Sequence, residues 1–342
     1  MPLALERRAG ATVTPLDARR ERRARSGATL FVGLVNNMPD AALRATERQF
    51  SRLLQAAAGA IDVRLRLYAL PEVPRSAQAR AAMAARYRDA DEIFSDGVDA
   101  LIVTGAEPVA ADLVGEPYWR ALTGLIDRAD GGTHSTILSC LAAHAGVRHF
   151  DGVARRGLPA KCSGVFAFET TARHPLVAGL EAGVTVPHSR RNELDRAELA
   201  RHGYRVLTAD PSIGVDAFVG ERRSLFVFLQ GHPEYDADTL AREYRRDIDR
   251  FLRGAQEQAP VLPVNCFPPA VERACEAFLA RARAARRPAL MREFPATLAS
   301  AGAEAPWRGA AIRFYANWLG LVAQRKAGAR DNAPIAAVAG RG

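Results

Sequence analysis

Short apolar segments typical of buried strands alternate with segments of helical periodicity along most of this chain. Buried strands are predicted where apolar runs lead into a turn or a glycine, in the segments 30–36, 99–108, 135–140 and 224–236. The segment 41–58 between the first two places its leucines and Phe50 on one helical face. Strands that alternate with helices predict an α/β fold, with a mainly parallel sheet and helices on both faces.

Two further segments have a clear pattern. The segment 63–70 alternates apolar with basic residues, which predicts a half-exposed strand at the edge of the sheet. The segment 307–322 carries Ile312, Tyr315 and Trp318 at helical spacing, and we interpret it as a helix that packs against the core.

Chemically useful residues follow three of the buried strands. These are Thr104-Gly105, Cys140 and His232, each at the carboxyl end of its strand. In parallel sheets ligands bind beyond the carboxyl ends of the strands. We therefore expect a single site that contains all three.

Cys140 is the candidate nucleophile. It lies between the strand 135–140 and the helix-prone segment 141–146, where a helix N-terminus favours a thiolate. The same geometry turns the backbone N–H of Leu141 toward an oxyanion, and the loop 104–109 is placed to give a second donor. A cysteine at the end of a buried strand can also be a plain core residue, so Cys140 alone does not decide the matter.

His232 and Glu234 provide the partners that a cysteine nucleophile needs. In the segment GHPEYD, Glu234 is close enough to hydrogen-bond the imidazole and to hold its tautomer. Cysteine, histidine and glutamate then act as nucleophile, base and orienting group. No metal-ligand motif occurs among the histidines, so we expect no metal.

The composition is typical of a cytoplasmic globular protein. Of the 342 residues 48% are hydrophobic and 25% charged, and no apolar run is long enough to span a membrane. The N-terminus has no signal-peptide pattern. Cys162, Cys266 and Cys275 are scattered, and we interpret them as structural free thiols in a reducing compartment.

The arginine distribution shapes the domain organisation that we expect. Residues 1–28 are arginine-rich and unpatterned, which predicts a disordered arm. Residues 29–325 are expected to form one domain, within which 254–310 is divergent and partly irregular, and 326–342 a flexible tail. The net charge of +9 would also suit nucleic acid, but no nucleic-acid motif accompanies the clusters, and a solvated surface is the preferred interpretation.

Several motifs in fixed order resemble the homoserine O-acyltransferases, a family with a class I glutamine-amidotransferase-like fold. The matching segments run from about Leu30 to Val322 and include VNNMPDAALRATERQFSRLL, DALIVTGA, LSCLAAHA, KCSGVF, VPHSR, GHPEYD, YRRD and LPVNCFPP. The resemblance implies a flavodoxin-like α/β fold and a homodimer without a bound cofactor.

The resemblance also implies a reaction and its residues. The family moves a succinyl or acetyl group from acyl-CoA to the γ-hydroxyl of L-homoserine by a ping-pong mechanism. Cys140 resembles the nucleophile that carries the acyl thioester, His232 the base and Glu234 its orienting partner. Lys161, Ser189 and Arg246 match the residues that bind the amino-acid substrate.

The chain departs from the family pattern at three positions. Val109 stands where succinyl users typically have glycine and acetyl users glutamate, and Glu107 lies nearby. Succinyl-CoA is the preferred donor on this basis. Leu141 and Arg191 replace a tryptophan and a tyrosine next to the substrate positions, which leaves serine or another hydroxy amino acid open as acceptor. A glutaminase or amidase, and a non-catalytic protein of the same fold, are the remaining alternatives.

Overall fold

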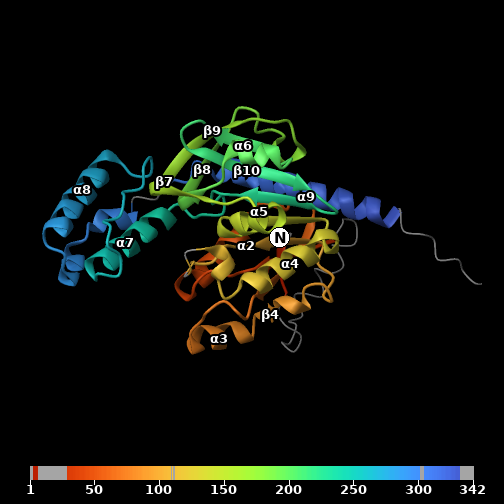
Figure 1. Cartoon of the computed structure of the whole chain (residues 1–342), viewed down its shortest axis with the longest axis horizontal. Helices are drawn as coiled ribbons and strands as arrows, with labels where there is room; N and C mark the ends of the chain where they lie inside the picture. Colours follow the sequence, from red (N-terminus) through yellow and green to blue (C-terminus); the bar gives the residue numbers. More distant parts are fainter. Residues whose placement is uncertain (1–2, 7–28, 109, 111, 301–303, 332–342) are drawn as a thin grey trace, which may run out of the picture.

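The computed structural model describes residues 3–6, 29–108, 110, 112–300 and 304–331. Within these residues, an 11-stranded sheet has the order β1-β3-β2-β5-β6-β11-β10-β9-β7-β8, with β4 paired to β3. Figure 1 labels β4 and β7 to β10 of this sheet. The strands are β1 (Leu3–Leu5), β2 (Thr29–Val35), β3 (Asp62–Ala69), β4 (Tyr87–Asp89), β5 (Ala100–Val103), β6 (Ser135–Ser139), β7 (Arg156–Thr170), β8 (Val184–Glu193), β9 (Arg205–Asp210), β10 (Gly214–Glu221) and β11 (Leu225–Leu229).

The sheet has a parallel half and an antiparallel half. Strands β1, β3, β2, β5, β6 and β11 pair in parallel, whereas β11, β10, β9, β7 and β8 pair antiparallel. The predicted parallel α/β sheet is therefore confirmed for the half that carries the candidate chemistry. The expectation of an edge position for 63–70 is wrong, because β1 and β4 both pair with the outer side of β3.

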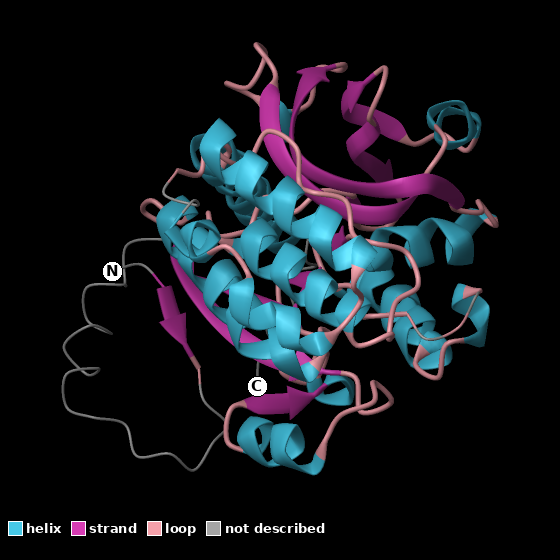
Figure 2. Ribbon diagram, turned by 90° about the vertical axis from the view of Figure 1, so that its left-hand side faces the viewer, coloured by secondary structure: helices cyan, strands magenta, loops and turns pink. Residues whose placement is uncertain are grey.

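Helices cover both faces of the parallel half (Figure 2). Helices α2 (Asp40–Ala57) and α9 (Arg308–Asp331) pack on one face, and α4 (Trp119–Gly132) and α5 (Leu141–Asp151) on the other. The remaining helices are α3 (Ala77–Ala84), α6 (Arg196–Arg201), α7 (Thr239–Leu252) and α8 (Pro269–Ala284), with 3-10 turns at Ala90–Glu92, Leu113–Gly115, Pro175–Val177, Pro288–Glu293 and Ala296–Ser300. No helix in the described ranges is both long enough and apolar enough to cross a membrane.

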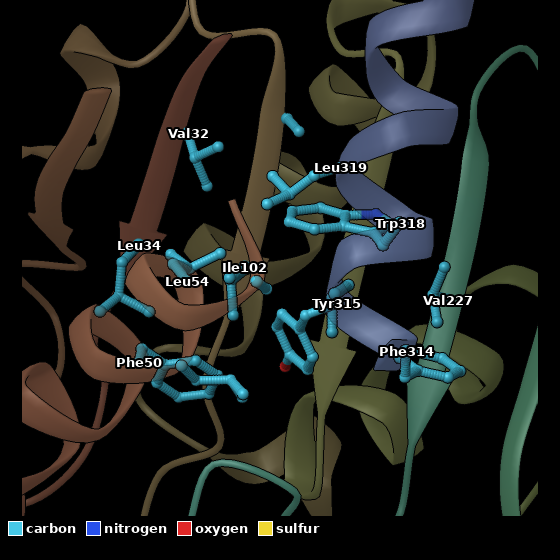
Figure 3. Packing of buried hydrophobic residues seen from close by; sticks show 14 of the residues in the cluster. Val32, Leu34, Phe50, Leu54, Ile102, Val227, Phe314, Tyr315, Trp318 and Leu319 are labelled. Carbon is cyan, nitrogen blue, oxygen red and sulfur yellow. The ribbon is translucent and has the colours of Figure 1, made fainter. Parts of the chain in front are cut away.

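Successive residues of the buried strands point to opposite faces of the sheet and belong to two hydrophobic cores. In β2, Leu34 packs toward α2 and α9, whereas Val35 packs toward α4 and α5, as the period of a strand requires. Figure 3 shows Trp318 and Leu319 of α9 beside the strands. The interpretation of 307–322 as a core-packing helix is confirmed.

The expected domain limits differ from the structure at both ends. Residues Leu3–Leu5 form β1 instead of belonging to a disordered arm, and α9 continues to Asp331 instead of giving way to a tail at 326. Residues 7–28 and 332–342 lie outside the described residues. The segment 254–310 is only partly irregular, because α8 forms a hydrophobic cluster with α7 at one end of the molecule (Figure 1).

Candidate active site

Cys140 occupies the sharp turn between β6 and α5. Its backbone has φ 53° and ψ −114°, a region that costs a non-glycine residue of order 1–3 kcal/mol. A hydrogen bond of 2.7 Å from the Cys140 N–H to the carbonyl of Leu229 holds the turn. A strained turn from strand to helix is typical of nucleophiles, because it presents the side chain at the end of the sheet.

His232 and Glu234 emerge at the same edge of the sheet as Cys140. Strand β11 runs parallel to β6 with Leu229 opposite Ser139, so the residues that follow these strands come together. His232 Nδ1 lies 2.8 Å from Glu234 Oε1, and both side chains are buried. Because Nδ1 is occupied by the carboxylate, Nε2 is the ring nitrogen left for Cys140. The structure thus brings the three predicted residues together.

The electrostatics of this cluster favour a charged imidazole. Burial alone would lower the pKa of His232, but the charge of Glu234 and the interaction with the Cys140 side chain outweigh burial and raise that pKa well above its usual value of 6.5. The ring of Tyr235 stacks on that of His232, with 4.3 Å between the centroids, and fixes its plane. The buried imidazole is therefore stabilised in its charged form next to Cys140.

The loop after β5 lies against the start of α5. A Cβ built on Gly105 would lie 3.1 Å from both the backbone nitrogen and the Cβ of Leu141. Glycine therefore leaves space beside the Leu141 N–H that another residue would fill. The loop is fixed by Thr104, whose Oγ1 accepts a hydrogen bond from the Asn37 N–H at 2.9 Å. Gly105 and Leu141, both predicted to belong to the site, are in contact.

Lys161, Ser189 and Arg246 meet through two acids of α7. Lys161 Nζ donates to Asp247 Oδ2 at 2.8 Å, and Ser189 Oγ donates to Glu243. Arg246 donates to Asp247 Oδ1 through Nε at 3.2 Å and Nη2 at 3.1 Å. The three predicted substrate residues, which come from β7, β8 and α7, are therefore held in one network.

Sequence reasoning missed Glu243 and Asp247. Burial alone would raise the pKa of Asp247, but the charges and hydrogen bonds of Lys161 and Arg246 lower it below its usual value. Glu243 also accepts a hydrogen bond from Tyr235 at 2.7 Å, which connects this network to the histidine. A signal was present in the sequence, because residues 243, 246, 247 and 250 share one face of a helix.

One cavity of about 300 Å³ connects the two groups. Its lining includes the candidate triad and the predicted substrate and oxyanion residues, namely Cys140, Leu141, Lys161, Ser189, His232, Glu234 and Arg246. The site is thus a cavity at the carboxyl ends of the parallel strands, where ligands bind in such folds, and these polar and charged side chains line it.

Sequence comparison decides the family. The sequence model of the family described as homoserine O-succinyltransferase matches residues 6–327. The chain belongs to the homoserine O-succinyltransferase family. A homoserine O-succinyltransferase of Methylorubrum extorquens is 50% identical over 298 residues, which cover 87% of this chain and 88% of that protein. One of Rhodopseudomonas palustris is 50% identical over 297 residues, which cover 87% and 89%.

Solved structures with resembling folds are much more distant in sequence. A glutamine amido transferase from Methylobacillus flagellatus is 14% identical, with a TM-score of 0.47, and the match covers 86% of this chain and 96% of that one. The family assignment confirms the predicted resemblance to the homoserine O-acyltransferases, and with it the prediction of an acyltransferase enzyme. It also sets aside the glutaminase alternative.

Val109, for which the resemblance implies a role in acyl specificity, lies outside the described residues. Its neighbour Glu107 is described, and its carboxylate accepts a hydrogen bond of 2.6 Å from Arg250 Nη1. That bond and the charge of Arg250 lower the pKa of Glu107. Glu107 is therefore an ion-paired carboxylate, not an isolated negative charge at the cavity.

A second histidine–carboxylate pair supports the turn before His232. His188 Nε2 lies 3.1 Å from Asp216 Oδ1, and both groups are buried. A Cβ on Gly231 would lie 2.6 Å from each of these atoms, so only glycine lets the chain pass over the pair. Sequence reasoning missed the pair because its members are far apart in the chain.

The remaining three cysteines, Cys162, Cys266 and Cys275, have raised thiol pKa values. Burial raises the pKa of Cys162, that of Cys266 to about 12 and that of Cys275 to about 11. These thiols are therefore poor nucleophiles at neutral pH. Among the described residues, no group of three or more His, Cys, Asp or Glu side chains is arranged to hold a metal ion.

Proposed function

We propose that this enzyme transfers the succinyl group of succinyl-CoA to the γ-hydroxyl of L-homoserine through an acyl thioester on Cys140. The observation that carries the proposal is the contact of Cys140, on a strained turn, with the buried His232–Glu234 pair. The family assignment supports the succinyl group and the acceptor, because the relatives are named homoserine O-succinyltransferases.

In the first half-reaction the Cys140 thiolate attacks the thioester carbon of succinyl-CoA. The oxyanion that forms lies in the space that Gly105 leaves open beside the Leu141 N–H. When the tetrahedral intermediate collapses, the bond to the CoA sulfur breaks, and the His232 imidazolium gives its proton to the departing thiolate. The products are free CoA and succinyl-Cys140, with His232 neutral.

In the second half-reaction homoserine takes the place of CoA. Neutral His232 removes the proton of the γ-hydroxyl while the oxygen attacks the succinyl carbonyl, and Cys140 leaves as a thiolate. The enzyme returns to its starting thiolate–imidazolium state. Glu234 acts throughout by keeping Nδ1 occupied, so that proton transfer takes place at Nε2.

The acceptor is held by the network on α7. The Arg246 guanidinium, half-exposed and anchored on Asp247, is suited to bind the homoserine carboxylate. The acids Glu243 and Asp247 provide negative charge for the α-ammonium group. Lys161 balances these acids, so the pocket does not repel a zwitterion.

The ion pair of Glu107 supports a succinyl donor. An unpaired carboxylate in the loop after β5 would repel the distal carboxylate of succinate, as the glutamate of acetyl users does. In this chain Arg250 compensates the charge of Glu107. The charge of Glu107 therefore does not argue against succinyl-CoA as the donor.

The decisive measurement is the intact mass of the protein after incubation with succinyl-CoA or acetyl-CoA in the absence of an acceptor. We expect a gain of one succinyl group with succinyl-CoA, and none in Cys140→Ala. Cys162→Ala is the matched control and should still be acylated. Homoserine should discharge the adduct and serine should not. An adduct that persists in Cys140→Ala, or an unmodified wild-type protein, would contradict the proposal.

A further inference from the structure

The cavity has a second wall, where the loop after β5 lies against the start of α5. It is formed by Gly105, Leu141, His144 and Arg155, which come from the loop after β5, from α5 and from the segment that follows α5. None of these side chains takes part in the network that holds the acceptor. This wall therefore faces a different part of the reacting molecules.

Arg155 is the unusual member of this wall. Its side chain is half-buried, and it has no acidic or hydrogen-bond partner in the part of the chain that the structure describes. The other arginines of the cavity are differently placed. Arg246 and Arg250 are paired with acids, and buried Arg190 donates to His188 Nδ1 and to two backbone carbonyls.

His144 shows how close Arg155 lies to the nucleophile. It follows Cys140 by four residues, about one helical turn of 5.4 Å, and helical side chains tilt toward the N-terminus of their helix. Burial, followed by the charges of Arg155 and Arg190, lowers the pKa of His144 to about 3. His144 is therefore neutral, and its buried Nδ1 has no hydrogen-bond partner among the described residues.

The geometry points to Arg155 as the residue that binds the distal carboxylate of the acyl group on Cys140, so that the enzyme selects a succinyl over an uncharged acyl donor. This assignment rests on the proposed function. The succinyl chain places its carboxylate three carbon–carbon bonds from the thioester carbon, roughly 4 Å at about 1.5 Å per bond with bond angles included. That length is comparable to the turn of α5 that separates Cys140 from His144.

The alternative cations are less suited to this role. Lys161 and Arg246 share Asp247 and lie on the acceptor side of the cavity. Arg191 is exposed and lines both this cavity and the open cleft outside it. A half-buried, unpaired guanidinium forms the stronger contact with a carboxylate, because less solvent screens it.

The test compares three donors with the full-length enzyme: succinyl-CoA, butyryl-CoA and acetyl-CoA. Butyryl-CoA has the chain length of succinyl-CoA without its charge. In Arg155→Gln we expect kcat/KM for succinyl-CoA to fall by roughly 10- to 100-fold, the range of a hydrogen bond between charged groups. The kcat/KM for butyryl-CoA should change by less than about threefold, because this donor has no carboxylate to lose a charged hydrogen bond. Arg155→Lys keeps the positive charge and should restore part of the preference for succinyl-CoA.

Two arginine variants make the assignment specific. Arg156→Gln alters the neighbouring exposed arginine, which pairs with Asp195 outside the cavity, and should leave the donor ratio unchanged. Arg191→Gln tests the competing cation. Equal losses with succinyl-CoA and butyryl-CoA in Arg155→Gln, or a selective loss in Arg191→Gln instead, would overturn the assignment. A wild-type enzyme that uses none of the three donors would contradict the proposed function itself. The ratio of kcat/KM for succinyl-CoA to that for butyryl-CoA does not depend on the folded fraction, so a partly unfolded variant does not obscure the result.

Discussion

Glu234 is the main group that raises the pKa of His232, since burial acts in the opposite direction. The pair therefore sets the pH range in which Cys140 faces a cationic imidazole. When the imidazolium loses its proton at high pH, the enzyme should lose activity, because no acid remains to protonate the departing CoA thiolate. The alkaline limb of the pH profile thus reports the histidine, and the carboxylate should control its position.

We predict that Glu234→Gln shifts this alkaline limb to lower pH, because removal of the carboxylate lowers the pKa of His232. The pH dependence of CoA release from succinyl-CoA, a step in which the imidazolium protonates the departing thiolate, measures the shift. We also expect kcat to fall by about 10²-fold or more, since the base loses its orientation. Glu276→Gln, an exposed substitution on α8, is the matched control. An unchanged alkaline limb would show that Glu234 does not govern the histidine.

The same pKa shift has a consequence for stability. A group whose pKa is higher in the folded state stabilises that state fully below its unfolded pKa, and the contribution is lost as the pH rises through the folded value. For His232 this window begins near 6.5 and extends upward. The wild-type Tm should therefore decline across this range more steeply than that of Glu234→Gln, and parallel Tm profiles would contradict this.

At the scale of elements, the site depends on the close approach of the loop after β5 to the first turn of α5. Gly105→Ala places a methyl group 3.1 Å from the Leu141 nitrogen, in the space proposed for the oxyanion. Loss of one oxyanion donor typically reduces kcat by about 10²- to 10³-fold, and we expect a loss of this size in the rate of acylation. Stopped-flow release of CoA measures that rate.

The control for this substitution is Gly124→Ala on α4, where an added Cβ meets no atom within 4 Å. It should leave the acylation rate unchanged and raise stability slightly, because alanine favours a helix over glycine. Acylation of Gly105→Ala at the wild-type rate would exclude this loop from the oxyanion site.

The elements that sequence could predict are those whose pattern is local. Cys140 and His232 each follow a continuous apolar strand, and Glu234 is two residues from His232, so the local pattern was enough to predict that all three lie at the same edge of the sheet. Glu243 and Asp247 were not, because their partners Ser189 and Lys161 lie 54 and 86 residues away and meet them only through packing. The antiparallel strands β7 to β10 were missed for a related reason, since β7 mixes charged, small and apolar residues without strict alternation.

At the scale of the whole molecule, α9 connects the loop that contains His232 and Tyr235 to the opposite end of the sheet. At its start Trp307 Nε1 and Arg308 Nη2 donate to the carbonyl of Tyr235, at 3.1 and 2.9 Å. Further along, Trp318 Nε1 donates to Ser135 Oγ at the beginning of β6, at 2.9 Å. The helix lies in the core between these points (Figure 3). Its two ends should therefore affect the enzyme differently.

Two tryptophan substitutions, one at the residue before α9 and one within α9, separate these effects. Trp307→Phe keeps the packing but removes one donor to the loop of His232, and we expect kcat to fall roughly fivefold, the worth of a neutral hydrogen bond, with little change in Tm. Trp318→Ala removes a fully buried side chain and should reduce the free energy of unfolding by about 3–5 kcal/mol. The kcat of the molecules that remain folded should be near wild type, because the hydrogen bond of Trp318 goes to Ser135, at the end of β6 opposite to Cys140. Urea unfolding measures the loss of stability expected for Trp318→Ala, and kcat per folded molecule measures the loss of activity expected for Trp307→Phe. A catalytic loss confined to Trp318→Ala would show instead that the core, and not the start of α9, positions His232.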